Sequence, residues 1–75
     1  MRAARQIKLT YSFLEMPEGF HTVQVLGMDG RLIAVRNGVG AIRYSLGELT
    51  GAVPGMYVLS IRGEWGLISK MFMQF

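Results

Sequence analysis

The chain has no cysteine, one histidine and only two prolines among its 75 residues. Without cysteine, neither a disulfide nor a thiolate zinc site stabilises the fold, so stability must come from packing. A lone histidine does not make the usual zinc constellations or a recognisable catalytic triad. Charged residues are 17% of the chain and no apolar stretch approaches the roughly 20 residues of a membrane span. The sequence therefore predicts no metal site, no cofactor, no membrane span and no enzyme activity.

What is present is an apolar chain rich in glycine. Hydrophobic residues make up 51% of it and the mean hydropathy is +0.31, which is too apolar for a disordered tail. The 10 glycines are about twice the ~7% average and indicate many turns. We expect one small folded domain over residues 1–75. The opening residues lack the apolar region of a signal peptide, so we expect no export signal there.

Alternation of apolar and polar residues between regularly spaced turn signals predicts an all-β fold. The predicted strands are residues 7–13, 20–26, 31–36, 41–46, 56–62 and 67–75. Turns are expected at residues 16–19, 27–30, 37–38 and 63–66, and residues 47–55 are expected to cross between sheets with an irregular segment around Leu49. We predict an Ig-like β-sandwich of six to seven short antiparallel strands.

Side-chain parity along these strands predicts the core. Its expected members in the first strand are Ile7, Leu9, Tyr11 and Phe13. The strand over residues 56–62 is apolar on both faces and should be central. Met71 and Met73 are expected to point inward, and Trp65 either folds back over the core or docks a partner. His21 is expected at an exposed or edge position.

The charges are scattered rather than clustered. The net charge is +3 with a pI near 9.8, and no basic block follows a phosphate backbone. Four cations are expected to discourage strand pairing at sheet edges: Lys8, Arg36, Arg43 and Arg62. All five acids are expected in solvated turns: Glu15, Glu18, Asp29, Glu48 and Glu64. Paired-carboxylate catalysis is therefore not indicated.

Three segments, residues 22–33, 54–61 and 69–72, resemble a known module in their order and spacing. They are similar to the C-terminal sorting domain of cargo proteins of the type IX (Por) secretion system of Bacteroidetes-type bacteria. The matching motif residues are Gly30 with Arg31, Gly55 with Tyr57, and Lys70. The chain departs from the family pattern in having Gly27 for a common Asp and Ala52 for a common Leu, and the family's first strand is missing.

The resemblance implies a non-catalytic secretion signal that transits the periplasm on a larger cargo and reaches the cell surface or is secreted. Its implied partners are an outer-membrane translocon and a sortase. Gly30 and Gly55 would permit special backbone geometry, and Tyr57 would direct its hydroxyl at a loop carbonyl. The remaining candidates, for partner recognition, are Arg31, Lys70, Met71 and Phe72, with Arg31 and Lys70 solvated.

Two other functions stay open. One is an Ig-like structural or adhesive module of a surface or flagellar-hook-capping protein. The other is a small basic barrel that binds nucleic acid through Tyr11, Phe13 and Phe20, although these aromatic side chains are expected in the core. Because the core is small and without covalent cross-links, we expect marginal stability, a melt below ~80 °C, or self-association through edge strands.

Overall fold

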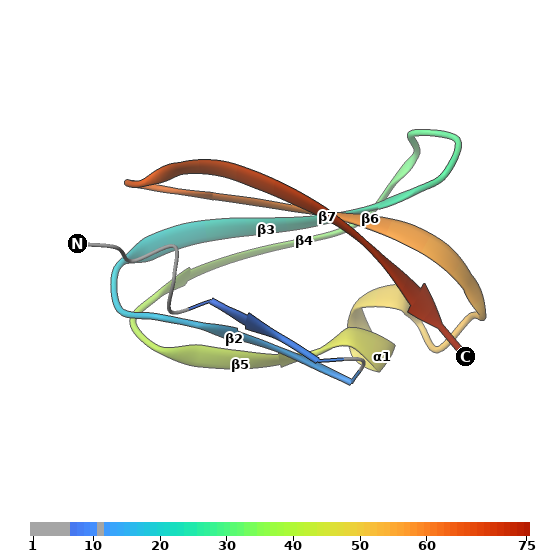
Figure 1. The fold of residues 1–75 in the computed structure, drawn as a ribbon, viewed down its shortest axis with the longest axis horizontal. Helices are drawn as coiled ribbons and strands as arrows, with labels where there is room; N and C mark the ends of the chain where they lie inside the picture. Colours follow the sequence, from blue (N-terminus) through green and yellow to red (C-terminus); the bar gives the residue numbers. More distant parts are fainter. Residues whose placement is uncertain (1–6, 11) are drawn as a thin grey trace.

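The computed structural model describes residues 7–10 and 12–75, which form seven strands and one short helix (Figure 1). Residues 1–6 and Tyr11 lie outside the described part. The elements are β1 (Lys8–Leu9), β2 (Phe13–Met16), β3 (Phe20–Gly27), β4 (Leu32–Val39), β5 (Ile42–Ser45), α1 (Leu46–Thr50), β6 (Gly55–Gly63) and β7 (Gly66–Gln74).

The strands form two facing antiparallel sheets (Figure 1). One has the order β1-β2-β5 and the other the order β4-β3-β6-β7. Every strand pair within them is antiparallel. The prediction of an all-β sandwich is therefore confirmed, and the connection from β5 to β6 crosses between the sheets as expected.

The core lies between the inner faces of the two sheets. In β3 and β6 the buried residues alternate with half-buried or exposed ones, as a sheet with one covered face requires. The buried hydrophobic residues are Leu14, Met16, Val23, Val25, Leu46, Leu49, Tyr57, Leu59, Ile61 and Phe72. The prediction that β6 is an internal strand is confirmed, but only one of its faces is covered, since Met56 on the other is 36% exposed.

The predicted strand over residues 7–13 is interrupted at Thr10. The Thr10 hydroxyl accepts hydrogen bonds from the backbone N–H groups of Ser12 and Phe13, at 3.3 and 3.0 Å. This local turn separates β1 from β2 and changes the side-chain parity, because a polar side chain near the backbone competes with the strand ladder. Leu14 and Met16 are consequently buried, and the prediction that Phe13 belongs to the core is wrong.

The hairpin predicted at Asn37–Gly38 is also wrong, because β4 continues through both residues. Gly38 lies opposite His21 in the sheet. A Cβ on Gly38 would lie 2.7 Å from His21 Nε2 and 2.8 Å from the Tyr44 hydroxyl. This glycine thus provides space for two packed rings rather than a turn, and the chain leaves the sheet at Gly40, where φ is +94°.

A short helix, α1, occupies part of the predicted crossing loop. Ser45 caps it by accepting the backbone N–H of Glu48 at 3.4 Å, and Gly51 ends it with φ of +68°. Leu49 is buried in this helix instead of lying in an irregular edge segment. The helix therefore closes one end of the core.

The hairpin between β6 and β7 is confirmed, with Gly63 paired to Gly66. Trp65, in the turn of this hairpin, is half-buried and packs against the core. Of the two alternatives predicted for it, folding back over the core is therefore confirmed. A Cβ on Gly63 would meet the Trp65 ring at 2.7 Å, which explains a glycine there. The hairpin at residues 27–30 is confirmed as well, with the Gly30 N–H donating to the Gly27 carbonyl at 3.0 Å.

The inward face of β7 differs from the prediction. Met71 and Met73 are 55% and 44% exposed, whereas Phe72 is 8% exposed. Phe72 pairs with the buried Tyr57 of β6 across the ladder, and residues directly opposite each other share a face. The register with β6 therefore places the methionines outside.

We expect Gly38→Ala to lower the free energy of unfolding by about 1–3 kcal/mol, because the new methyl group overpacks the site beside His21 and Tyr44. Urea denaturation of the two proteins measures the change. Gly47→Ala is the matched control, since its Cβ would have no neighbour closer than 3.8 Å. An equal unfolding midpoint for Gly38→Ala and the parent chain would contradict the role given to this glycine.

Candidate functional site

Three of the predicted motif residues, Gly30, Gly55 and Tyr57, lie toward one end of the four-stranded sheet. Gly27, Tyr57 and Phe72 form one row across β3, β6 and β7. The Tyr57 and Phe72 rings are stacked with centroids 5.6 Å apart. Gly55 begins β6 with φ of +149°, and Gly30 lies in the β3–β4 loop with φ of +87°. Both glycines thus have the backbone geometry expected of them.

Tyr57 ties this end of the sheet to the connection that precedes β6. Its ring is 6% exposed, and its hydroxyl donates a 2.6 Å hydrogen bond to the Val53 carbonyl. The prediction that Tyr57 reaches a loop carbonyl is confirmed. Ala52, in the same connection, has φ of +61°, a backbone conformation that is unfavourable for a residue with a Cβ. The Tyr57–Val53 hydrogen bond helps to hold the connection in this conformation.

Arg31 and Lys70 are both exposed, as predicted, but they do not converge. Arg31 lies in the β3–β4 loop, where its side chain is 80% exposed and 3.8 Å from the Asp29 carboxylate. Lys70 lies on β7, at the opposite edge of the sheet from β4. Phe72, also a candidate for recognition, lies in the core and offers no side chain to a partner in the folded domain.

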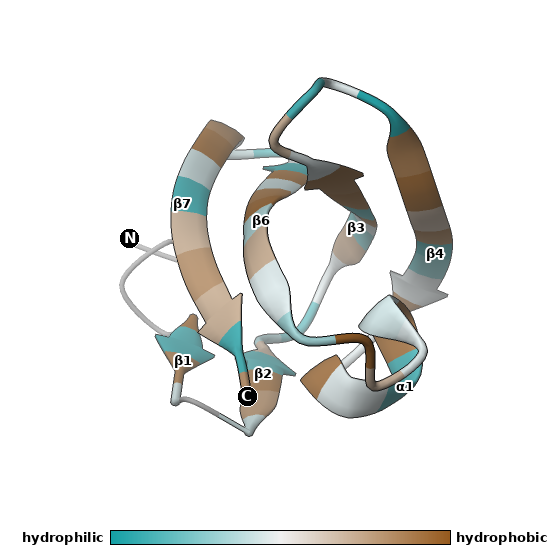
Figure 2. Cartoon of the chain, turned by 90° about the vertical axis from the view of Figure 1, so that its right-hand side faces the viewer, coloured by the Kyte–Doolittle hydropathy of each residue, from teal (hydrophilic) through white to brown (hydrophobic). Residues whose placement is uncertain are grey.

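An apolar stripe crosses the outer face of the four-stranded sheet. Leu32, Leu26, Val58 and Met71 form one row over all four strands, and the adjacent row pairs Met56 with Met73. Leu32 and Met71 are at least half exposed. Brown segments on β4, β6 and β7 in Figure 2 show this apolar character. Met71, a recognition candidate, therefore belongs to a larger exposed surface.

The outer face of the three-stranded sheet carries an ion pair beside an exposed aromatic ring. Glu15 on β2 and Arg43 on β5 form a 3.1 Å ion pair, and the Arg43 guanidinium lies over the Phe13 ring.

Two predictions about charged residues are corrected in part. Glu15 lies in a strand and Glu48 in α1, so the expectation that all acids lie in turns is wrong for these two. Of the four expected edge cations, Arg62 lies on the internal strand β6, whereas the other three lie on edge strands.

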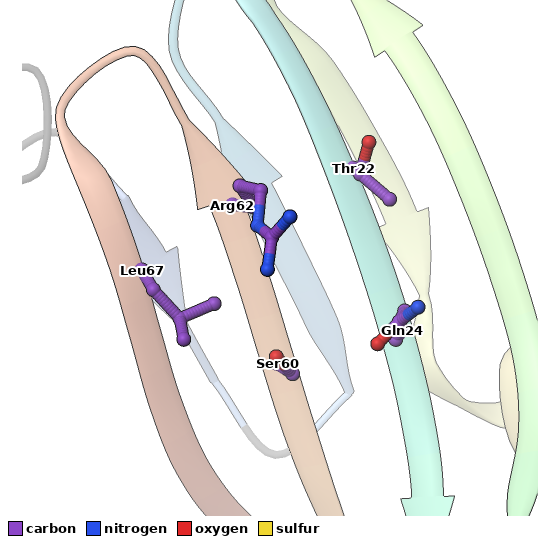
Figure 3. Close-up of a pocket in the computed structure, with 5 residues that line it drawn as sticks. All are labelled: Thr22, Gln24, Ser60, Arg62 and Leu67. Carbon is purple, nitrogen blue, oxygen red and sulfur yellow. The ribbon is translucent and has the colours of Figure 1, made fainter.

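A small hollow lies beside the apolar stripe (Figure 3). It encloses about 120 Å³ and is lined by Thr22, Gln24, Ser60, Arg62 and Leu67. Figure 3 shows the Arg62 side chain extending over the face of the sheet. Pockets that enclose small-molecule ligands measure roughly 300–1,000 Å³, so this one holds solvent-sized species only.

The aromatic residues considered for nucleic-acid stacking do not form a platform. Phe13 lies on the three-stranded sheet and Phe20 on the four-stranded sheet, where it is 54% exposed. The expectation that Phe20 belongs to the core is therefore wrong. Tyr11 lies outside the described residues. Successive stacked bases require neighbouring rings, which these two do not provide.

His21 is the polar residue that sequence reasoning misplaced. It is 1% exposed on the internal strand β3, so the expectation of an exposed or edge position is wrong. Its Nε2 lies 2.7 Å from the Tyr44 hydroxyl, and the two rings meet edge to face. The parity that His21 shares with the buried Val23 and Val25 was the signal that could have placed it inside.

The His21–Tyr44 pair joins the two sheets, because β3 and β5 belong to different ones. His21 Nδ1 is buried without a hydrogen-bond partner among the described residues. Burial raises the pKa of the Tyr44 hydroxyl, and the Arg36 cation opposes that rise. Within residues 7–10 and 12–75, no three His, Asp or Glu side chains come together as metal ligands would.

Comparison with known proteins identifies no relative: no protein-family model, curated protein or solved structure matches the chain. Among the described residues, no helix has the length and apolar character needed to cross a membrane.

We expect Tyr44→Phe to destabilise the fold by about 1–3 kcal/mol at pH 7, because buried His21 loses its hydrogen-bond partner. Burial raises the pKa of Tyr44 in the folded state above its ordinary value of about 10. The protonated hydroxyl therefore stabilises the fold fully below pH 10, and this stabilisation is lost as the pH rises through the pKa of the folded state. Urea midpoints between pH 7 and 11 should therefore fall more steeply for the parent chain than for Tyr44→Phe.

Tyr57→Phe is the matched control at pH 7, because it removes a hydroxyl from the other end of the core and keeps the His21–Tyr44 bond. Parallel pH profiles for the parent chain and Tyr44→Phe would show that the Tyr44 hydroxyl does not contribute as described.

Proposed function

We propose that the chain is a non-catalytic C-terminal secretion signal domain that directs a larger cargo protein across the outer membrane through the type IX secretion system. One observation carries the proposal. The three segments that resemble the family's sorting domain contribute most of β3 and β6 and part of β7, which are adjacent strands of one sheet. Segments that are separate in the sequence therefore lie side by side, which supports the proposal.

The mechanism is recognition of a folded domain, in which this chain breaks no bond. Gly30, Gly55 and Tyr57 set the shape of one end of the sheet. Arg31, Lys70 and Met71 are the exposed members of the set and would meet the translocon. By resemblance, a sortase at the cell surface then separates the domain from its cargo, after transit through the periplasm.

The test is a fusion of the chain to the C-terminus of an exported reporter in a cell that has a functional type IX system. We expect the reporter at the cell surface or in the medium. Arg31→Gln with Lys70→Gln should reduce its surface fraction at least several-fold, because both changes remove charges from exposed positions without touching the core. Protease accessibility on intact cells measures the surface fraction.

Lys8→Gln, which also neutralises an exposed cation, is the matched control and should leave export unchanged. Periplasmic retention of the parent fusion would overturn the proposal. A reporter that reaches the surface equally well in cells without the type IX system, and stays attached to the domain, would instead assign the chain to the adhesive or structural class.

A further inference from the structure

Among residues 7–10 and 12–75, the sandwich is open on the side where β1 and β7 lie. A groove of about 350 Å³ enters between these two strands, which are edge strands of different sheets. Its lining includes the buried residues Leu14, Leu59 and Ile61, together with Ile7, Leu9, Ile68 and Lys70. In the described part of the chain, an apolar opening therefore reaches the core from this side, and Lys70 is the one charged residue that lines it.

The β7 strand borders this groove with a long free backbone edge. It is nine residues long and pairs only with β6 among the described residues. It contains no proline and one charge, Lys70, whereas edges that resist pairing are short, bulged or rich in charge. The opposite edge strand, β4, faces an irregularity in its pairing at Val25 and Leu26. The backbone of β7 is thus the better template for a further strand.

Lys70 gives this edge a charge preference. It pairs with Leu59 in the ladder and so belongs to the row that faces the groove. Among the described residues no carboxylate lies within 4 Å of its ammonium group, since the two ion pairs that form are Asp29 with Arg31 and Glu15 with Arg43. A carboxylate on an added strand would meet an unpaired cation there.

We propose that the free edge of β7 binds an extended peptide strand that continues the four-stranded sheet. Alternate side chains of that strand enter the groove, so they are apolar, and the one beside Lys70 is Asp or Glu. Main-chain hydrogen bonds to β7 supply affinity, and the alternate side chains supply selectivity. Side chains on the other face of the added strand lie beside Met71, at the end of the apolar stripe. The site does not depend on the secretion role, because it is argued from the groove, the free edge of β7 and the Lys70 charge.

The probe is a capped heptapeptide, Thr-Val-Thr-Glu-Thr-Val-Thr. With Glu opposite Lys70, its two Val residues lie opposite Ile68 and Phe72, and the palindromic order serves parallel and antiparallel binding equally. The control peptide has Lys in place of the central Glu. Each peptide is titrated into the ¹⁵N-labelled chain, and binding is measured by amide chemical shifts and amide hydrogen exchange. Binding should slow the exchange of β7 amides and leave the exchange of β4 amides unchanged.

We expect the Glu peptide to bind at least about fivefold more tightly than the Lys peptide, which is the size of effect that an exposed ion pair together with an avoided like-charge pair produces. Lys70→Glu should reverse the preference. The exposed position of Lys70 makes this variant compatible with the fold. Should it nevertheless unfold by circular dichroism, the comparison of the two peptides on the parent chain still decides.

Four results would overturn the proposal. Equal affinity for the two peptides contradicts the charge preference at Lys70, and no change in β7 at millimolar peptide contradicts the peptide site itself. A dimer by sedimentation velocity whose β7 amides are protected without peptide assigns the edge to a second copy of the chain. Decanoate that binds the groove where neither peptide does assigns it to an anionic amphiphile. None of these results bears on the secretion assay, which is read separately in cells.

Discussion

The alternation of buried side chains on β3 and β6 is the constraint on which the rest of the structure depends. Four side chains, each at most 1% exposed, pair across these strands in alternate rows of the ladder: Val23 with Ile61, and Val25 with Leu59. A slip of one residue would turn all of them toward solvent, so the register is strongly fixed. That register then aligns β7 on β6, which stacks Phe72 on Tyr57 and places Lys70 in the row facing the groove.

Two tyrosine hydroxyls complete the core at its ends. Tyr44 joins the sheets through His21, and Tyr57 holds the connection before β6 through the Val53 carbonyl. In a chain without disulfides, such bonds supply the specificity that apolar packing lacks, because a buried polar group left without a partner is costly. They also explain why the core accepts His21, whose other ring nitrogen has no partner among the described residues.

Much of this fold could be predicted from local patterns, and the failures have physical causes. Alternation over residues 20–26 and 56–62 gave the correct strands because each has a single buried face. The hairpin prediction at Asn37–Gly38 failed because Gly38 makes room for rings from other strands, and local sequence does not reveal which rings those are. The prediction of the buried face of β7 failed because both sets of alternating residues in this strand contain apolar side chains. For the candidate site, the geometry of Gly30, Gly55 and Tyr57 was predictable, whereas the groove beside Lys70 was not, since β1 and β7 are distant in sequence.

The edge strand β7 is the strand best placed to meet a partner. β7 has one neighbour in its sheet, yet it is already extended and held by Phe72, so a strand added to it orders the peptide without first ordering the domain. Binding to a preformed edge avoids the conformational entropy cost on the receptor side. The His21–Tyr44 pair lies on β3 and β5, whereas Tyr57 stacks on Phe72 of β7 and the Thr50 hydroxyl of α1 donates to the Gln74 side chain of β7 at 3.2 Å. The added strand would bind the free backbone edge of β7, and Phe72 would stay packed in the core.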